Sequence, residues 1–430
     1  MDEKACLFYF FDNYQCDYIR AENQNVSDYL KQEYRKFLDG LKIALDGDNE
    51  GIEELCNEIK SNLDFIEDNC KQIAEVVEKR ERGFFKQACD QAFKLFNNWE
   101  SYIFSARYLK DNFYRIRKGD FSKGNENIQR KELFHAPINK NKYISSGRYS
   151  ISGYPCLYLS DGLGLSWLET GAPNNFSYAV LNFCQGAPFN VIDFSITPNM
   201  FHSSYHVYKQ YMNNFGIKYI ISFPFQLACS LKVKNRSDAF KAEYIIPQIL
   251  MQWLLEKSKY DGIKYKSSLN SSTAKKYGYS NYVYPTKSYR TDGFDEKLVN
   301  SFELSNIEYV KIKDWFDGAK KEFDCAKELR NKLVKKNKDA IISRIVNLFD
   351  EIEKCKENII NGNNDEDNYS KMDDIYRDIK NLKKEINKES LEVDFEVTKL
   401  IEKIENLHYD IIPLLIGKNN KLHFKKIGED

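Results

Sequence analysis

The sequence predicts an α+β protein in which a central domain with a mixed β-sheet is flanked by an N-terminal and a C-terminal helical domain. Apolar residues recur every three or four positions before about residue 112, as they do along one face of a helix. Short β-prone runs replace this spacing between 113 and about 305, where most of the 20 glycines also fall. Helical spacing then returns. These changes of period predict three domains, 1–112, 113–305 and 306–430.

The N-terminal domain contains three apolar stripes, which predict an antiparallel helical bundle. The first stripe follows Ser27, a candidate N-cap, and stops before Gly47. It consists of Leu30, Tyr34, Phe37, Leu38, Leu41 and Leu45. The second stripe covers 52–77 in steps of three or four residues, and the third covers 85–106.

The central domain contains short runs rich in β-branched and aromatic residues, separated by Gly and Pro. The predicted strands are 156–159, 178–184, 190–194, 219–223, 262–265 and 282–284. The alternation over 114–118 is also typical of an edge strand. One helix is expected where Pro247 fits a first turn and Ile249, Leu250, Trp253 and Leu254 form an apolar face.

The C-terminal domain returns to helical spacing on both sides of a polar stretch. Trp315, Ala319, Phe323 and Ala326 open it, and a long stripe follows from 341 to 359. The polar sequence at 361–368 (NGNNDEDN) predicts an exposed linker, after which apolar stripes resume over 372–386 and 400–411. We expect 418–430 to be loosely ordered.

Composition narrows the functional classes. Lys+Arg and Asp+Glu both total 64, so no bulk field attracts nucleic acid or membrane. No signal core and no run of about 18 apolar residues is found, so a cytoplasmic location is expected. Ten scattered cysteines without C-x-x-C spacing are typical of reduced core thiols. His202 and His206 are too few for a zinc site without a third ligand, and no metal is expected.

The densest chemistry lies between residues 147 and 169. Arg148 stands between Gly147 and Gly153, which allow a sharp turn close to a ligand, and its guanidinium can grip a phosphate or carboxylate with two hydrogen bonds. Tyr158 falls in the 156–159 strand. Ser160 is a candidate N-cap for a helix over 161–170, which would place Glu169 in its last turn. We interpret the group as a site for a polyanionic ligand.

These blocks resemble a RES domain over about 113–290. The matching stretches are Tyr114-Arg115, Gly147-Arg148-Tyr149-Ser150, Gly153-Tyr154-Pro155, Leu157-Tyr158-Leu159-Ser160, Glu169, Asp261-Gly262-Ile263-Lys264-Tyr265-Lys266-Ser267-Ser268 and Asn281-Tyr282-Val283-Tyr284-Pro285. The family usually has Trp or Phe and then Asn after its Arg, so Tyr149-Ser150 is a mild departure. An insertion at about 195–240, which could form a lid or an added helix, separates the two halves.

The resemblance implies an ADP-ribosyltransferase-like fold and an enzyme that consumes NAD⁺. By residue match, Arg148, Tyr158 and Glu169 correspond to the family's catalytic Arg, Tyr and Glu, and Ser267 to its Ser. Ser268 is the alternative, because the doublet makes the match ambiguous. NAD⁺ binding is assigned to Arg148, Tyr149, Tyr158, Ser268 and Arg115, although Arg115 also fits the edge strand.

The N-terminal stripes are similar in architecture to HEPN helical domains, which precede RES domains in some larger proteins. HEPN ribonucleases need an Arg and a His four to six residues apart, and residues 1–112 contain no His, so nuclease activity there is not expected. Arg130 and His135 have the spacing, but they lie at the entry to the central domain. We interpret that match as coincidence.

The sequence therefore predicts an enzyme that cleaves the nicotinamide–ribosyl bond of NAD⁺, with water, phosphate or a macromolecule as the acceptor. The resemblance implies a bacterial toxin or anti-phage defence effector that arrests growth by NAD⁺ depletion and is paired with an antitoxin or inhibitor protein. The alternatives are ADP-ribosyl transfer to a protein or nucleic acid, and a non-catalytic nucleotide-sensing module. The long apolar stripes also predict that a helical segment supports a homo-oligomer or restrains the pocket.

Overall fold

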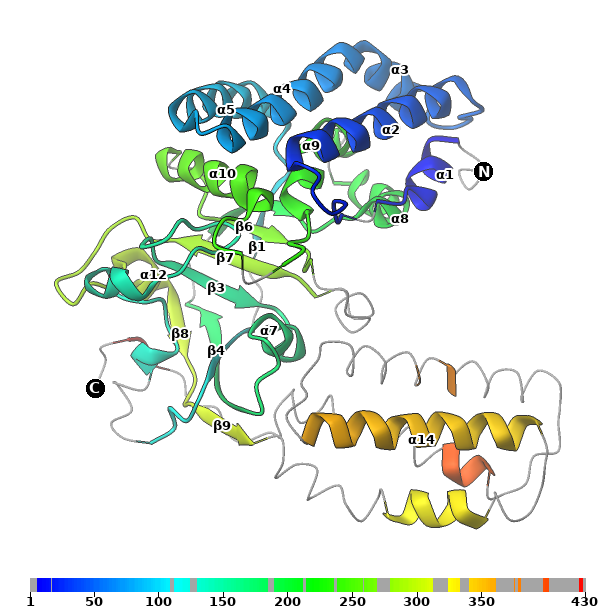
Figure 1. Cartoon of the computed structure of the whole chain (residues 1–430). Coiled ribbons are helices and arrows are strands. Elements are labelled where there is room, and N and C mark those ends of the chain that lie inside the picture. Colours follow the sequence, from blue (N-terminus) through cyan, green and yellow to red (C-terminus); the bar gives the residue numbers. More distant parts are fainter. Residues whose placement is uncertain are drawn as a thin grey trace.

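A computed structural model covers the chain (Figure 1). The structure describes residues 6–16, 18–108, 112–123, 130–184, 189–211, 214–235, 238–257, 259–268, 279–311, 324–332, 340–360, 375, 378–379, 397–401 and 425–427.

The central domain is built on one mixed nine-stranded sheet, as far as the described residues go. The strands are β1 (Ser105–Tyr108), β2 (Phe113–Lys118), β3 (Cys156–Ser160), β4 (Asn175–Phe183), β5 (Phe189–Phe194), β6 (Gly262–Tyr265), β7 (Asn281–Pro285), β8 (Phe302–Leu304) and β9 (Glu308–Lys311). Their order is β1-β5-β6-β7-β3-β2-β4-β8, with β9 also paired to β4, and β5 with β6 is the parallel pair. Together with the helices, this sheet confirms the α+β class.

Strand β2 is interior to the sheet, so its interpretation as an edge strand is wrong. It pairs with β4 along its whole length, from Phe113 opposite Leu181 to Lys118 opposite Phe176. On its other side it meets β3 through Tyr114 opposite Ser160. Phe113 and Ile116 are its buried residues, and Arg115 and Ile116 border a pocket, so the polar positions of this strand do not mark an unpaired edge.

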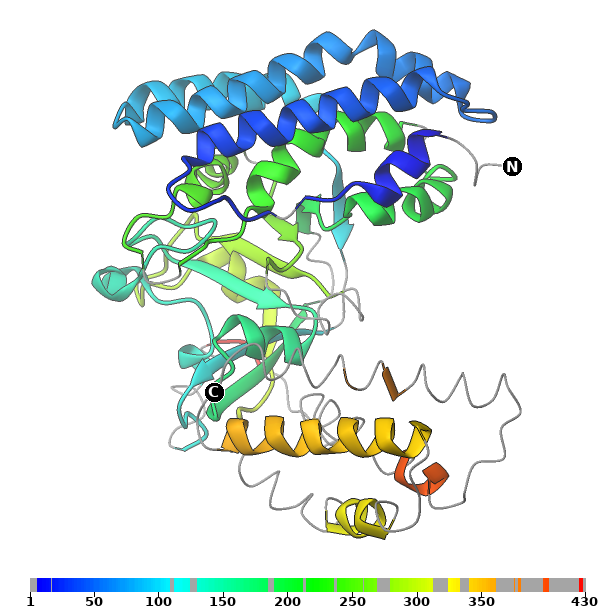
Figure 2. The same ribbon diagram turned by 45° about the vertical axis from the view of Figure 1, so that its right-hand side comes forward.

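A layer of helices covers the part of the sheet that contains β1, β5 and β6 (Figures 1 and 2). Its N-terminal members are α1 (Cys6–Asn13), α2 (Val26–Asp46), α3 (Glu53–Ser61), α4 (Leu63–Glu81), α5 (Phe85–Trp99) and the short η2 (Glu100–Tyr102). Helix α2 starts after Asn25, so Ser27 is not its N-cap. The 52–77 stripe is divided by Asn62 into two helices, and the third stripe leaves the helix after Trp99.

The predicted insertion contributes helices to this same layer. They are α8 (Pro198–Tyr208) and α9 (Phe215–Ser230). Directly after the insertion, η4 (Ala242–Tyr244) and α10 (Ile245–Glu256) join the layer, and α10 confirms the helix expected around Pro247. The strand predicted at 219–223 is therefore wrong, because it lies inside α9. Nearly every residue of α9 is buried, so the helix lacks a polar face, and a short apolar run cannot be told from a buried strand by its period.

The N-terminal helices and α9 share one hydrophobic core. A single cluster of buried residues extends from Leu7 in α1 through α2–α5 and α9 to Ile263 in β6. Polar side chains join the same partners: Trp99 Nε1 donates to Ser222 Oγ at 3.0 Å, and Tyr34 Oη donates to the Pro224 carbonyl at 2.8 Å. At about 25 cal/mol per Å² of buried apolar surface, such packing supplies most of the stability of this layer.

Smaller elements complete the central domain. They are η3 (Ile138–Tyr143), α7 (Leu163–Glu169) and α12 (Glu296–Ser301). Two further clusters of buried residues line the sheet away from the helical layer: one centres on Phe113, Tyr282 and Phe302, and the other packs α7 through Trp167 against β2 and β4. Sheet and helices therefore hold α7 firmly, and Glu169 is its last residue, as predicted.

In the C-terminal region the structure describes α14 (Ala340–Ile360), which confirms the start of the 341–359 stripe as a helix. Arg330 donates two hydrogen bonds to the Asp350 carboxylate, at 2.9 and 2.6 Å, and so ties residues 324–332 to α14. Lys425 exchanges two backbone hydrogen bonds with Leu304, and Ile427 is buried, so 425–427 are ordered, contrary to the expectation for 418–430. Trp315, the 361–368 linker and most of the later stripes lie outside the described residues.

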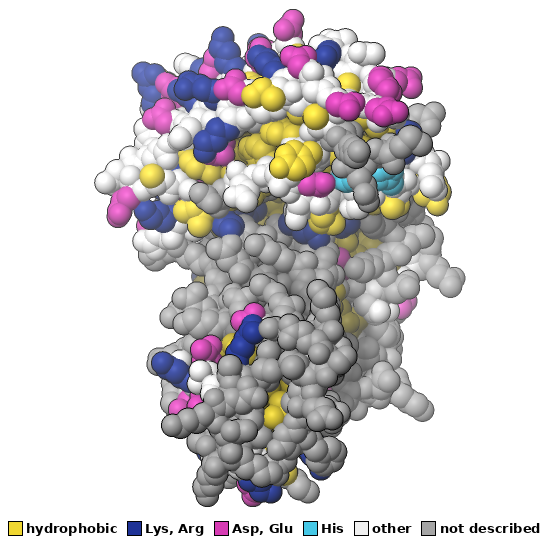
Figure 3. Space-filling view, turned by 90° about the vertical axis from the view of Figure 1, so that its right-hand side faces the viewer, with side chains coloured by type: hydrophobic (Ala, Val, Ile, Leu, Met, Phe, Trp, Pro, Cys, Tyr) yellow, Lys and Arg dark blue, Asp and Glu magenta, His cyan; other side chains and the backbone are white. Residues whose placement is uncertain are grey.

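The surface agrees with the balanced composition. Lys and Arg intermingle with Asp and Glu over the helical layer on the face seen in Figure 3. Within the described part of the chain, no helix is both long enough and apolar enough to cross a membrane. All ten cysteines are free thiols, as predicted.

His135 is a core residue. Its side chain is fully buried, Nε2 accepts a hydrogen bond from the Asp295 backbone N–H at 3.1 Å, and Nδ1 lies 2.9 Å from the Ala136 carbonyl. Burial lowers the pKa of His135 from 6.5 to about 4. The neutral ring is therefore part of the native structure, and its partner Asp295 caps α12 by accepting from Leu298 N–H.

This burial predicts an acid-dependent loss of stability. In the unfolded protein His135 takes up a proton near pH 6.5, whereas in the folded protein it does so near pH 4. The contribution of the neutral ring to the free energy of unfolding is therefore full above pH 6.5 and falls as the pH drops toward 4. The full effect is about 3 kcal/mol. Urea unfolding at pH 7.5 and 5.5 measures the free energy of unfolding at each pH. The difference between the two values should be smaller for His135→Gln than for wild type. Equal differences in wild type and His135→Gln would contradict the assignment.

Candidate active site

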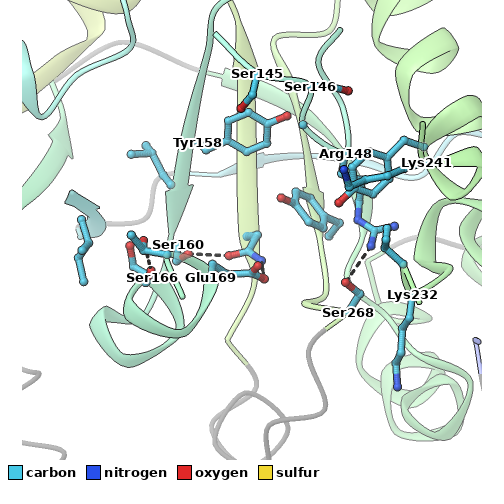
Figure 4. Close-up of a pocket in the computed structure, with 18 of the residues that line it drawn as sticks. Ser145, Ser146, Arg148, Tyr158, Ser160, Ser166, Glu169, Lys232, Lys241 and Ser268 are labelled. Atoms are coloured by element: carbon cyan, nitrogen blue, oxygen red, sulfur yellow. Dashed lines mark hydrogen bonds between the residues drawn. The ribbon is translucent and has the colours of Figure 1, made fainter. Parts of the chain in front are cut away.

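A polar pocket of about 740 Å³ opens where β3, β2 and β7 meet α7 and the segment between α9 and α10. Its volume lies within the range of about 300–1,000 Å³ that small-molecule sites occupy. The lining residues are Arg115, Ile116, Ser145, Ser146, Gly147, Arg148, Ser152, Tyr158, Leu159, Ser160, Ser166, Glu169, Thr170, Lys232, Val233, Asp238, Ala239, Lys241, Tyr244, Tyr265, Ser268 and Asn281. Of the predicted site residues, Arg115, Arg148, Tyr158, Glu169 and Ser268 therefore share one cavity (Figure 4).

Arg148 is held in a tight turn of the loop before β3. Gly147 N–H donates to the Ser150 carbonyl at 2.8 Å, and Gln248 of α10 donates from Nε2 to the Gly147 carbonyl at 2.9 Å. A Cβ at Gly147 would lie 2.7 Å from Tyr158 Oη, so only glycine fits there. Gly153, at the end of the loop, has φ +83°, a conformation that also favours glycine.

The Arg148 guanidinium is nine-tenths buried and fixed from three sides. Nη1 donates to the carbonyls of Cys229 and Leu231, at 2.9 and 2.8 Å, where α9 ends. Nη2 donates to Ser268 Oγ at 2.8 Å, and the Tyr244 ring lies 5.1 Å from the guanidinium carbon. Carbonyls at a helix C-terminus carry partial negative charge, so they favour a cation there. Three of the five N–H groups are thus used by described protein atoms.

Tyr158 holds the loop as well as facing the pocket. Its hydroxyl accepts from Tyr149 N–H at 3.2 Å and lies 3.0 Å from Ser150 Oγ. Burial raises the pKa of Tyr158 above the ordinary value for tyrosine, so the phenol stays neutral. Its position on β3, next to the Arg148 turn, fixes the distance between loop and sheet.

Glu169 stands at the other end of the pocket lining from Arg148 (Figure 4). Its Oε1 accepts two hydrogen bonds, from Ser267 Oγ at 2.7 Å and from Asn281 Nδ2 at 2.5 Å. Asn281 is buried and its Oδ1 in turn accepts from Ser160 Oγ at 2.5 Å. Two donors on one oxygen fix the direction of the carboxylate.

The prediction that Ser160 is the N-cap of the helix is wrong. It is the last residue of β3, and α7 begins only at Leu163 after Gly162. Its hydroxyl is already engaged by Asn281, which satisfies both groups inside the protein. The serine thus contributes indirectly to the site, through the amide that contacts Glu169.

The two candidate serines lie on different sides of the pocket. Ser267 contacts Glu169, whereas Ser268 contacts Arg148. Ser268 lines the cavity and Ser267 does not. Tyr149 lies outside the lining as well: its ring is fully buried and packs 4.8 Å from the Tyr265 ring.

More cations than carboxylates line the pocket. They are Arg115, Arg148, Lys232 and Lys241, against Glu169 and Asp238. Figure 4 shows Arg148, Lys232 and Lys241 together on the side away from Glu169. Arg115 Nη1 donates to the Tyr158 carbonyl at 2.8 Å, and its buried Nε finds no partner among the described residues. Desolvation lowers the pKa of Arg115 to about 10, which still leaves it charged at neutral pH. In a chain with no net charge, this concentration of cations favours an anionic ligand.

Sequence reasoning missed several pocket residues, among them Lys232, Lys241, Tyr244 and Asn281. Asn281 was inside a matching block, but only the contact with Glu169 shows its role. Lys232 comes from the end of the insertion, and Lys241 and Tyr244 follow shortly after it. This stretch has no motif and reaches the pocket only through the packing of α9 and η4. Among described residues, no group of three His, Cys, Asp or Glu side chains is arranged to hold a metal ion.

The fold and the pocket together define an α+β protein with an arginine and a glutamate in one cavity of about 740 Å³. A search of curated proteins finds similarity to a Bacillus subtilis (strain 168) protein named "Putative toxin YopC", 27% identical over 307 residues. The match covers 69% of this chain and 64% of that protein, so it spans less than two thirds of the relative's length. No family model and no solved structure matches the chain.

The contacts of Tyr158 predict that its hydroxyl orders the Arg148 loop. Tyr158→Phe should lower the free energy of unfolding by about 1–3 kcal/mol, because the Tyr149 N–H loses its acceptor in a buried site. It should also speed amide hydrogen exchange in residues 144–153. Tyr282→Phe, which removes a buried hydroxyl on the neighbouring strand, should leave exchange in that loop unchanged. Unaltered loop exchange in Tyr158→Phe would show that the hydroxyl has no such role.

Proposed function

We propose that this protein is an enzyme that cleaves the nicotinamide–ribosyl bond of NAD⁺. The observation that carries the proposal is that Arg148 and Glu169, which match the RES Arg and Glu, line one pocket of about 740 Å³. The cavity offers cations for a diphosphate and a fixed carboxylate for a positively charged transition state. Both are what this reaction requires.

Arg148 would hold the diphosphate. The N–H groups that are not engaged by Cys229, Leu231 or Ser268 remain for a ligand, as far as the described residues go. Charge-assisted hydrogen bonds from a guanidinium to phosphate are short and strong. Because the side chain is fixed before any ligand arrives, little conformational entropy is lost on binding.

Glu169 would stabilise the transition state. As the bond to nicotinamide breaks, positive charge develops on the ribose as an oxocarbenium ion, while the cationic nicotinamide leaves as a neutral molecule and needs no general acid. Both described hydrogen bonds go to Oε1, so Oε2 is the oxygen left for the ribose. A preorganised group of this kind typically contributes about 10²–10³ in rate, by analogy with the carboxylates of glycosidases.

Tyrosine rings would enclose the reacting end. Tyr158 and Tyr265 both line the cavity, and both carry neutral phenols because burial raises their pKa values. Aromatic faces can pack against the planar nicotinamide and exclude bulk water. The acceptor of the ADP-ribosyl group is water, phosphate or a macromolecule. The labelled products identify which of them it is.

The biological role that we propose is a cytoplasmic toxin that drains NAD⁺. The name of the Bacillus subtilis relative supports the toxin part of this proposal. An enzyme that consumes a central cofactor would arrest its own cell unless restrained, so an antitoxin or inhibitor protein is proposed as a partner. A defence role against phage is consistent with such an arrest.

The first test of this proposal is the loss of NAD⁺ on incubation with purified protein. Glu169→Gln preserves shape and one hydrogen-bonding oxygen but removes the charge, so it should slow NAD⁺ loss by about 10²–10³. Arg148→Lys should raise KM, since one ammonium cannot replace the guanidinium's contacts. Glu303→Gln, a strand substitution outside the pocket lining, is the matched control and should behave as wild type.

Label placed in the adenosine part of NAD⁺ identifies the acceptor. Free labelled ADP-ribose or its phosphate ester is expected for NAD⁺ depletion, whereas label retained on protein or nucleic acid would favour macromolecular transfer. If wild type binds NAD⁺ but leaves it intact, the nucleotide-sensing alternative is correct. Full activity in Glu169→Gln would reject the residue assignment.

Asn281 tests whether the same carboxylate must be held in place. Its amide donates to Glu169 Oε1 at 2.5 Å, so Asn281→Ala removes one of the two described hydrogen bonds that fix the carboxylate. We expect kcat to fall in Asn281→Ala, because a carboxylate that is less well oriented stabilises the transition state less. A wild-type kcat in folded Asn281→Ala, measured as NAD⁺ loss at saturating NAD⁺, would show that this contact has no such role.

A further inference from the structure

The segment before α2 reaches the pocket wall from the helical layer. Tyr18 accepts a hydrogen bond on its carbonyl from Lys232 N–H at 2.7 Å, and Lys232 lines the pocket. Two residues further along, Arg20 Nε donates to Glu243 Oε1 at 3.0 Å. Arg20 also donates from Nη1 to the Gln24 carbonyl, at 2.8 Å, which fixes its own position.

Both partners of this segment adjoin groups that hold Arg148. Lys232 directly follows Leu231, whose carbonyl accepts from Arg148 Nη1. Glu243 directly precedes Tyr244, whose ring lies 5.1 Å from the Arg148 guanidinium carbon. The segment therefore contacts the direct sequence neighbours of two residues that hold the guanidinium.

The Arg20–Glu243 pair is suited to a positioning role. The Glu243 side chain is 3% exposed and that of Arg20 is 23% exposed, so the pair lies mostly out of solvent. An ion pair in such a place is directional, and loss of one partner leaves a buried charge that must move or find water. Loss of an exposed ion pair would change the free energy of unfolding little.

We propose that Arg20 is a positioning residue for the active site and acts through Glu243 and Tyr244 on Arg148. The inference deepens the proposed function and rests on it for its kinetic readout. In this arrangement the N-terminal segment sets how well the cationic end of the pocket grips the diphosphate. The N-terminal helices therefore belong to the catalytic unit, although they contribute no residue to the pocket lining.

Steady-state kinetics with NAD⁺ separates positioning from a general loss of structure. Arg20→Ala should raise KM about fivefold to tenfold with kcat changed less than twofold, because Arg148 would lose affinity for a group bound equally in ground and transition states. Arg20→Lys should recover part of the wild-type KM, since it keeps a cation opposite Glu243. A merely structural role would instead lower the active fraction at unchanged KM.

Lys257→Ala is the matched control. Lys257 pairs with Glu100 at 3.1 Å in the same helical layer, with side chains 31% and 22% exposed, and neither residue lines the pocket. Its KM should equal that of wild type. A wild-type KM in both Arg20→Ala and Arg20→Lys would overturn the inference, as would an equal rise of KM in Lys257→Ala.

Amide hydrogen exchange tests the inference without turnover. Residues 229–235, which include the Lys232 N–H bonded to Tyr18, should exchange faster in Arg20→Ala than in Lys257→Ala or wild type. If wild type does not consume NAD⁺, the proposed function fails, and exchange still decides the structural link. Unchanged exchange at 229–235 in folded Arg20→Ala would reject it.

Discussion

The burial of the Arg148 guanidinium is the constraint on which the site depends. A charged group that is nine-tenths buried must have its N–H groups bonded in place, because an unpaired buried charge costs several kcal/mol. The carbonyls of Cys229 and Leu231 meet this need only if α9 ends where it does. The end of α9 is fixed in turn by its packing against α2, α4 and the sheet. A side chain on a loop is thereby positioned by the main hydrophobic core.

The opposite charge is held by a different part of the structure. Glu169 ends α7, and it receives donors from Asn281 on β7 and from Ser267 just after β6. These elements pack on the sheet next to β3. Because Arg148 and Glu169 are fixed by their own hydrogen-bond partners, they do not collapse into an ion pair with each other. A ligand with separated negative and positive character can then use both.

The sequence predicted the site better than the fold around it. Arg148, Tyr158 and Glu169 stand in short stretches where glycine, strand and helix signals are close together, and local chemistry is enough to predict that they share a pocket. The strand predicted at 219–223 was wrong because α9 is apolar on every side, so the spacing of its apolar residues does not distinguish a helix from a strand. The N-cap predicted at Ser160 was wrong because strand pairing places its hydroxyl beside Asn281, 121 residues away in the sequence. Residues such as Tyr244 and Lys232 carry no local signal, since only tertiary packing brings the insertion to the pocket.

The packing also explains why an insertion and an N-terminal segment, far apart in sequence, occur together. Helix α9 has no polar face, and alone on the sheet it would expose a large apolar surface to water. Helices α2–α5 cover that surface, and Trp99 and Tyr34 satisfy polar groups of α9 from their side. The carbonyls that bind Arg148 belong to the end of the same helix. Loosening of the end of α9 would therefore act directly on the guanidinium, whereas the described partners of Glu169 stand at β6 and β7. Control through the end of α9 would thus act mainly on substrate binding.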